Sequence, residues 1–190
     1  GLTLNDIDGV LLTHEHDDHI RSVEALSAFI PVYSHPDTLE YVANKFALPL
    51  RQQMEIEQQY FNIGTFDILP FRISHDALHP YGFVINDCDS KMAYITDTGF
   101  ISKGCMALIK GSDTVMIESN HDKELLQLGA YPHFLKKRIL SEVGHLSNEE
   151  CALTITNLIE HGATKFMLAH LSEKNNLPEL AYWTTTNYLT

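Results

Sequence analysis

Six residues, HEHDDH at positions 14–19, place three histidines and three carboxylates directly behind an aliphatic stretch. His14 and His16 are two residues apart, so both rings point to the same side of an extended chain. Asp18 and His19 follow where the chain must turn into the next helix. This spacing offers two imidazoles to one metal ion, and a carboxylate with an imidazole to a neighbouring ion. Imidazole and carboxylate ligands suit Zn²⁺, Mn²⁺ or Fe²⁺, so the motif leaves the identity of the metal open.

Three further ligand candidates lie at the ends of other predicted strands. His75 stands in ISHDA, Asp97 in AYITDTG and His170 in FMLAHLS. Because α/β folds gather functional groups at strand ends, we expect these side chains to join the HEHDDH motif. A carboxylate such as Asp97 can bridge two ions about 3.5–4 Å apart. A turn residue is the alternative for Asp97, and a hydrogen-bonded strand-end histidine for His170. His79 competes with His75 for the same role.

The elements that must position these residues alternate between strand and helix, which predicts α/β layers with helices outside the sheets. Pro70, inside a predicted strand, indicates an edge or a bulge. The segment SNEE from Ser147 is a capping box that starts a helix, and Gly162 closes that helix. The predicted strands are residues 7–13, 31–34, 66–73, 82–86, 92–96, 114–117 and 165–169, and the predicted helices are residues 20–29 and those beginning at residues 36 and 147.

Composition restricts the class of protein. The chain has 190 residues, of which 44% are hydrophobic, so we expect one domain over residues 1–190. No apolar run approaches the roughly 18–20 residues of a membrane helix. The three cysteines form no CxxC pair, which argues against a disulfide framework and a thiolate zinc site and favours a cytoplasmic location. The net charge of −12 argues against general affinity for nucleic acid. Metal ions in a cleft would reverse that field locally, so a nucleic-acid enzyme remains open.

These motifs together resemble a known family. The order His14-x-His16-x-Asp18-His19, then His75, Asp97 and His170, is similar to the metal motifs of the metallo-β-lactamase superfamily. Within it, the segments ISHDALHPYGFVI, IESNHD with GHLSNEE, and LAHLSEKNNLPELA resemble the YycJ/WalJ-like branch. The resemblance extends over almost the whole chain and implies an αββα four-layer sandwich. Members normally have several strands before the first motif, so we expect this sandwich to be N-terminally incomplete and the chain to be a piece of a longer protein.

The resemblance also implies a reaction. Members near this branch cleave phosphodiesters, and YycJ-like proteins are nucleases acting on DNA ends, so the leading expectation is a 5′–3′ DNA exonuclease. Two divalent ions would hold a water or hydroxide that attacks phosphorus, and Asp18 would accept a hydrogen bond from it. His145, ahead of the Ser147 helix, matches the histidine that protonates the leaving group in related phosphodiesterases. Glu118 matches the acid that orients it. A helix-capping role is the alternative for His145.

Three residues are candidates for substrate contact. His121, shortly after Glu118, either contacts substrate or begins a helix. Lys137 and Arg138 belong to the densest basic run of the chain, YPHFLKKRI, and either bind flanking phosphates or form a solvated helix surface.

Two alternatives to the nuclease stay open at the level of sequence. One is a metallohydrolase for a small substrate, such as a cyclic phosphodiester, a thioester or a lactam. The other is a non-catalytic, metal-stabilised regulatory protein. The sequence does not separate DNA from RNA, and it does not set the cleavage polarity or the oligomeric state.

Overall fold

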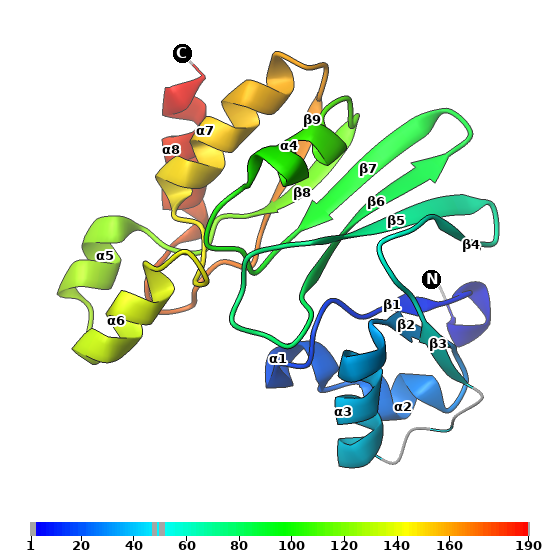
Figure 1. Cartoon of the computed structure of the whole chain (residues 1–190). Helices are drawn as coiled ribbons and strands as arrows, with labels where there is room; N and C mark the ends of the chain where they lie inside the picture. Colours follow the sequence, from blue (N-terminus) through cyan, green and yellow to red (C-terminus); the bar gives the residue numbers. More distant parts are fainter. Residues whose placement is uncertain (1–2, 47–48, 50–51, 190) are drawn as a thin grey trace.

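The computed structural model describes residues 3–46, 49 and 52–189, in which two β-sheets face each other with helices on both outer sides (Figure 1). The strands are β1 (Val10–Leu11), β2 (Val32–Ser34), β3 (Gln53–Glu55), β4 (Phe61–Ile63), β5 (Phe66–Arg72), β6 (Tyr81–Asp87), β7 (Ser90–Ile95), β8 (Thr114–Glu118) and β9 (Lys165–Ala169). The helices are α1 (Asp17–Ile20), α2 (Val23–Ser27), α3 (Pro36–Phe46), α4 (Lys103–Ile109), α5 (Lys123–Leu128), α6 (His133–Ile139), α7 (Asn148–Ile159) and α8 (Pro178–Tyr188), with a 3-10 turn at Leu4–Asp6.

The two sheets differ in strand direction. The smaller sheet, β1-β2-β3, is parallel. The larger sheet has the order β4-β5-β6-β7-β8-β9, and is antiparallel from β4 to β7 and parallel from β7 to β9. In the parallel part Ile95 pairs with Ile117, and Glu118 pairs with Ala169. The carboxyl ends of β7, β8 and β9 therefore meet at one edge, next to the residues that follow each strand.

Three clusters of apolar side chains hold the four layers together. Helices α1–α3 pack on the smaller sheet, where Val32, Leu39 and Val42 belong to one cluster. Residues from both sheets, including Phe83 and Leu11, fill the space between the sheets. The largest cluster joins β7 and β8 to α4 and α7. Every layer thus buries its apolar face against a neighbour, as an α/β sandwich requires.

Two predicted elements differ from the structure. The strand predicted over residues 7–13 pairs only at Val10–Leu11, because the following residues leave the sheet to form the HEHDDH turn. The helix predicted over residues 20–29 is divided into α1 and α2. The second half of the motif begins α1, and Ser22 has a near-zero ψ of −1° that interrupts the helix before α2. The apolar spacing that predicted one helix continues from α1 into α2.

Other local predictions are confirmed. Ser147 and Glu150 form the expected reciprocal capping box at the start of α7, and Gly162 has a φ of +97° just beyond its end. Pro70 lies in β5 opposite Phe83, without a bulge. The side of Pro70 that faces away from β6 lies beyond the last residue pair of β4 and β5. The missing N–H of Pro70 therefore costs the sheet no hydrogen bond on that side. Among the described residues, no helix is both long enough and apolar enough to cross a membrane.

Candidate metal centre and active-site cleft

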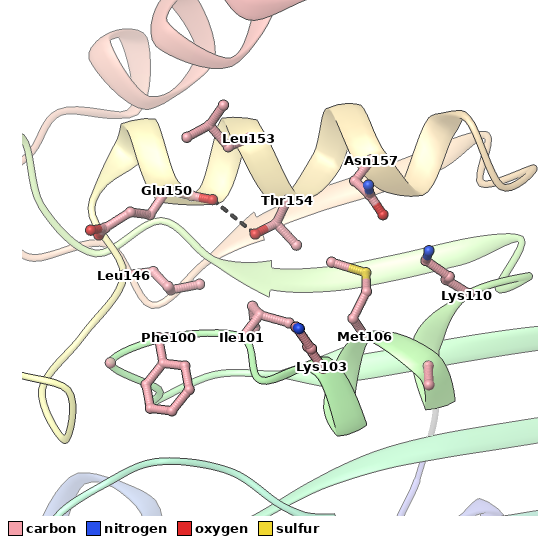
Figure 2. A pocket seen from close by; sticks show the side chains of 12 residues that line it. Phe100, Ile101, Lys103, Met106, Lys110, Leu146, Glu150, Leu153, Thr154 and Asn157 are labelled. Carbon is pink, nitrogen blue, oxygen red and sulfur yellow. Dashed lines mark hydrogen bonds between the residues drawn. The ribbon is translucent and has the colours of Figure 1, made fainter.

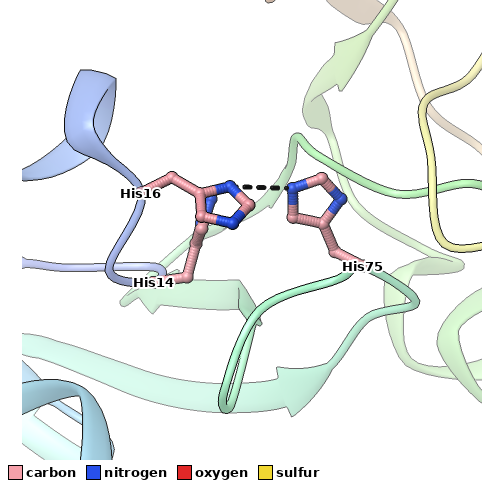
Figure 3. Close-up of side chains that lie close together, drawn as sticks. All are labelled: His14, His16 and His75. Atoms are coloured by element: carbon pink, nitrogen blue, oxygen red, sulfur yellow. Dashed lines mark hydrogen bonds between the residues drawn. The ribbon is translucent and has the colours of Figure 1, made fainter. Parts of the chain in front are cut away.

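Three predicted ligands, His14, His16 and His75, form a first group in which the rings converge (Figure 3). The ring centroid of His14 lies 4.5 Å from that of His16 and 5.1 Å from that of His75. Nε2 of His75 lies 3.3 Å from Nδ1 of His16. His14 and His16 follow β1 of the smaller sheet, whereas His75 follows β5 of the larger one. The group is therefore assembled across the two sheets.

The surrounding residues fix which nitrogen of His14 and of His75 faces the group. Thr13 Oγ1 lies 3.0 Å from Nδ1 of both His14 and His19, and a hydroxyl oxygen has two lone pairs to accept both N–H groups. Nδ1 of His75 lies 3.1 Å from the carbonyl oxygen of Val143. Nε2 of His14 is then left buried without a hydrogen-bond partner. A buried unpartnered imidazole nitrogen, oriented through its second nitrogen, fits a metal ligand.

A second group contains Asp18, His19, His170 and Asp97. Nε2 of His19 lies 3.3 Å from Oδ2 of Asp97 and 3.7 Å from Oδ2 of Asp18. Nε2 of His170 lies 3.3 Å from Oδ1 of Asp97 and 3.6 Å from Oδ2 of Asp18. Oδ1 of Asp97 also lies 3.8 Å from Nε2 of His75, which belongs to the first group. Asp97 thus stands between the two groups, where a carboxylate could bridge two ions.

Two of these residues have an unusual backbone. Among the described residues other than glycine, only Asp97 and His170 have positive φ values, 58° and 54°. Asp97 follows β7 by two residues, and His170 directly follows β9. A left-handed conformation costs a non-glycine residue roughly 1–3 kcal/mol and concentrates at functional sites. The bend turns both side chains from the end of the sheet toward the cluster, a feature that the sequence does not reveal.

Burial and the neighbouring charges set the protonation of the cluster. Burial, reinforced by His19, lowers the pKa of His14 to about 3, so this ring is neutral at pH 7. Burial raises the pKa of Asp97, but the hydrogen bond and charges of His19 and His170 outweigh it and hold that pKa below its usual value. Burial lowers the pKa of His170, while the hydrogen bond to Glu118 and the charge of Asp97 raise it to about 9. Binding a metal at His170 would therefore displace a proton.

The donor set fits two divalent ions. Within each of several groups the ligating atoms lie within 4.8 Å of one another, so that small side-chain movements would close them around an ion. Imidazole and carboxylate ligands without a thiolate are compatible with zinc, manganese or iron. The groups made of predicted ligands are His14–His16–His75, His14–His19–Asp97 and Asp18–His19–His170; a further group, Asp97–Glu118–His145–His170, contains the hydrogen-bonded pair of Glu118 and His145.

Glu118 connects a metal-ligand candidate to His145. Its carboxylate is fully buried at the end of β8. Oε1 accepts from Nδ1 of His145 at 2.7 Å and from Nδ1 of His170 at 2.8 Å, while Oε2 accepts from the backbone N–H groups of Thr98 and Leu146 at 3.0 and 3.2 Å. Burial raises the pKa of Glu118, but its bonds to His145 and His170 bring it below the usual value. One ionised carboxylate therefore orients both rings.

A cleft of about 590 Å³ opens over the second group. His145, Asp18 and His170 line it, and so does Arg138. Arg138 forms a two-point ion pair with Asp76, in which Nη2 lies 2.9 Å from Oδ1. This ion pair joins α6 to Asp76, the residue that follows His75. Arg138 is the only lysine or arginine among the described residues that line this cleft.

The other two proposed substrate contacts lie elsewhere. Lys137 lines a separate hollow together with His133, Lys136 and other residues of α5 and α6. His121 is 1% exposed, and neither ring nitrogen has a hydrogen-bond partner. Burial lowers its pKa. His121 does not line the cleft, and its backbone pairs with Ser147 beside the start of α7.

A third group of histidine and carboxylate, His35, Asp37 and His79, lies outside the cleft. Nε2 of His79 lies 2.8 Å from Oδ2 of Asp37, and the ring stacks on His35 with centroids 3.6 Å apart. The guanidinium of Arg72 contacts Nδ1 of His79. A permanent positive charge at this position opposes binding of a cation. We interpret the group as a structural contact that joins α3 to the loop carrying His75 and His79.

A second cavity of about 560 Å³ lies between α4 and α7 (Figure 2). Phe100, Ile101, Met106 and Leu153 give it an apolar lining, and none of the candidate metal ligands contributes to it. The candidate metal ligands therefore all lie outside this cavity.

Sequence reasoning missed four residues around the site. Thr13 stands directly before the motif, so the sequence THEHDDH contained a signal for it. Asp76 directly follows His75, but nothing in the sequence indicated that it pairs with Arg138. Tyr41 and Leu78, which also line the cleft, resemble ordinary helix and loop residues in the sequence.

The chain belongs to the metallo-β-lactamase superfamily. Residues 1–171 match the family described as the beta-lactamase superfamily domain. The chain is 37% identical to the exodeoxyribonuclease YycJ of Bacillus anthracis over 99% of its own length and 73% of that protein. It is 35% identical to the exodeoxyribonuclease WalJ of Streptococcus pneumoniae over 97% of its own length and 71% of that protein. Residue identity and fold together define a hydrolase related to these exodeoxyribonucleases.

A solved structure supports the fold. The metallo-β-lactamase fold protein YhfI of Bacillus subtilis superposes with a TM-score of 0.74 at 20% identity, covering 97% of this chain and 73% of that one. The predicted fold class is therefore confirmed.

Proposed function

We propose that this metallo-β-lactamase-fold hydrolase cleaves phosphodiester bonds and acts as a DNA exonuclease. The observation that carries the proposal is the Glu118–His145 hydrogen bond of 2.7 Å at the edge of the cleft. An alkoxide leaving group of a nucleic acid needs a proton as the P–O bond breaks. An imidazole held by a buried carboxylate, beside Asp97 and His170, is suited to deliver that proton.

The seven metal-ligand candidates would hold two divalent ions, zinc or manganese being our first choices. When bound, such ions polarise a phosphodiester and lower the pKa of a water molecule toward neutrality. The protein's own residues would do the remaining work. Asp18, whose side chain is 55% exposed, would accept a hydrogen bond from the attacking water. Burial raises the pKa of Asp18, but His19 and His170 lower it below its usual value, which keeps the carboxylate ready to accept.

DNA is the substrate we propose because two relatives of high coverage are named exodeoxyribonucleases. The formal net charge of −12 opposes approach of a polyanion, so binding must depend on the cleft. Arg138 would contact a phosphate beside the cut, and Lys137, which makes no ion pair with any described residue, would contact a phosphate further along. His121, which is buried beside the start of α7 and does not line the cleft, would act on the substrate only indirectly. Free cysteines fit the expected reducing cytoplasm.

The test compares the chain loaded with Zn²⁺ or Mn²⁺ on DNA labelled at either end, on RNA and on a nitrophenyl phosphodiester. DNA should be shortened from one end, and the label that is released first assigns the polarity, which we expect to be 5′ to 3′. Intact DNA and RNA beside rapid hydrolysis of a cyclic phosphodiester, a thioester or a lactam would overturn the proposal.

His145→Ala tests the role of the proton donor. Turnover on DNA should fall roughly 10²–10⁴-fold. The loss on the nitrophenyl ester should be much smaller, because nitrophenolate leaves without a proton, and metal content should be unchanged. His161→Ala, at an exposed site beyond α7, is the matched control. An equal loss on both substrates would mean that His145 serves the structure and not proton transfer.

A small-substrate metallohydrolase is the second candidate. The observation in its favour is that Arg138 is already paired with Asp76, which leaves little free positive charge for a polyanion. A non-catalytic regulatory role would be supported only if no substrate of any class were hydrolysed.

A further inference from the structure

The cleft has room for more than a phosphate. Its volume of about 590 Å³ falls in the range of roughly 300–1,000 Å³ typical of pockets that bind whole small molecules. The phosphate of a substrate would lie at the metal-ligand candidates, near Arg138 and His145. The remaining volume must contact another part of the same substrate.

One wall of the cleft differs in chemistry from the rest. Two of its lining residues, Tyr41 and Leu78, have no carboxylate, imidazole or guanidinium group. The exposed fractions are 42% for Tyr41 and 49% for Leu78, so both large apolar surfaces face solvent. Tyr41 belongs to α3, and Leu78 belongs to the loop between β5 and β6. Arg138 and His145 come from different elements, α6 and the segment ahead of α7.

The aromatic ring of Tyr41 is partly exposed. None of the described aromatic rings packs against it, and its hydroxyl makes no hydrogen bond with any described residue. Nζ of Lys45 lies 5.9 Å from the ring centroid and is held in place by an ion pair with Asp17. Thus the ring is available to a ligand and has a positive charge beside it.

The apolar wall is held in a defined position by the third histidine–carboxylate group. Asp37 and Tyr41 are four residues apart on α3, so they share one side of the helix. Asp37 binds His79 at 2.8 Å, directly after Leu78 in the chain. The backbone N–H of Leu78 also donates to Oε1 of Glu15 at 2.9 Å, which ties the loop to the HEHDDH motif. Tyr41 and Leu78 are therefore fixed relative to the metal-ligand candidates.

We propose that Tyr41, supported by Leu78, is a stacking platform for the nucleobase attached to the reacting phosphate. The inference rests on the proposed nuclease function and specifies which part of the substrate fills the second half of the cleft. Every nucleobase presents an aromatic face, so stacking of this kind accepts any base. Combined with metal-held phosphate, it would select a nucleotide over an inorganic or simple alkyl phosphate ester without selecting a sequence.

The test is a double-mutant-type cycle in which the Tyr41 ring and the terminal nucleobase are removed separately and together. Wild type, Tyr41→Ala and Tyr41→Phe, each loaded with Mn²⁺ or Zn²⁺, act on DNA whose terminal nucleotide is normal or abasic, with either end modified. Loss of a stacked base should raise KM roughly 5- to 150-fold, with a smaller change in kcat. Tyr41→Phe should behave as wild type because the hydroxyl is not used. On the abasic end, Tyr41→Ala and wild type should have the same KM, because the two changes remove one interaction.

Tyr60→Ala is the matched control, since Tyr60 is 58% exposed and does not line the cleft. It should match wild type on both ends. If Tyr41→Ala cleaves normal DNA with wild-type KM, or if wild type does not distinguish the abasic end, the platform is overturned while the nuclease function stands. If wild type cleaves neither DNA end, the proposed function fails, and the platform fails with it. The abasic comparison on wild type needs no variant, so a folding defect in Tyr41→Ala does not affect it.

Discussion

Glu118→Gln would keep the shape of the buried side chain while changing its hydrogen bonding. Four donors meet the carboxylate: Nδ1 of His145 and of His170 at Oε1, and the backbone N–H groups of Thr98 and Leu146 at Oε2. A glutamine offers one oxygen and one NH₂ group in place of two oxygens. Backbone N–H groups cannot become acceptors, so the amide oxygen must face Thr98 and Leu146. The NH₂ group then faces the two imidazoles.

Each imidazole must then give up its Nδ1 proton. For neutral His170 the proton moves to Nε2, the nitrogen that lies 3.3 Å from Asp97, and the ring can no longer offer a lone pair there. His145 loses the carboxylate that orients its ring. We expect kcat on DNA to fall roughly 10²–10⁴-fold, as for a misoriented catalytic histidine. At 1.36 kcal/mol per decade this is about 2.7–5.4 kcal/mol of activation free energy. Metal affinity should fall roughly 10–100-fold.

The assay measures kcat at saturating metal and, separately, the metal affinity by titration. Glu150→Gln is the matched control, because Oε2 of Glu150 meets only donors, the N–H and hydroxyl of Ser147 at 2.9 and 2.8 Å. An amide oxygen replaces it without a change of tautomer, and glutamine is accepted in capping boxes. Wild-type turnover and metal affinity in Glu118→Gln would refute the reasoning. So would an equal loss in Glu150→Gln.

Two further predictions concern packing and thiol chemistry. Gly99→Ala would place a Cβ 2.2 Å from the carbonyl oxygen of Glu142, so the segment leading to His145 must shift and DNA turnover should fall. In the control, Gly104→Ala, the new Cβ meets only a side-chain atom at 3.7 Å, and turnover should stay at the wild-type rate. Equal rates in the two variants would contradict this prediction. Burial raises the pKa of Cys151 to about 12, and its side chain is fully covered. A thiol reagent should therefore label exposed Cys88 first and reach Cys151 only after denaturation. Equal labelling rates in the native protein would contradict that assignment.

Much of the fold could be predicted because its signals are local. A capping box depends on neighbouring residues, and α7 formed where it was expected. The helix that begins at residue 36 and the strands expected at residues 82–86 and 92–96 also formed, as α3, β6 and β7. The failures also have local causes. The motif at residues 14–19 takes the chain out of β1 early, and the near-zero ψ at Ser22 divides a predicted helix. Apolar periodicity detects the buried side of such a segment but not an interruption of its hydrogen bonds.

The candidate site was predictable in residue type and only partly in arrangement. Spacing along the chain places His14 and His16 on one side of an extended segment, and the strand-end rule brings His75, Asp97 and His170 toward them. Tyr41 and Leu78 carried no comparable signal. Their position in the cleft depends on the contact of α3 with a loop about 40 residues away in sequence, which only packing creates.

The sequence by itself determined the superfamily, the ligand types and the absence of a thiolate from the motif, because those properties reside in residue identity and short covalent spacing. Only the tertiary structure decided which nitrogen of each ring faces inward, that Asp97 stands between the two groups, and that Glu118 holds His145 and His170 together. These relations follow from the register of β7, β8 and β9, which places Glu118 opposite Ala169 and next to His170. Register is set by packing between distant segments, so no local pattern in the chain contains it.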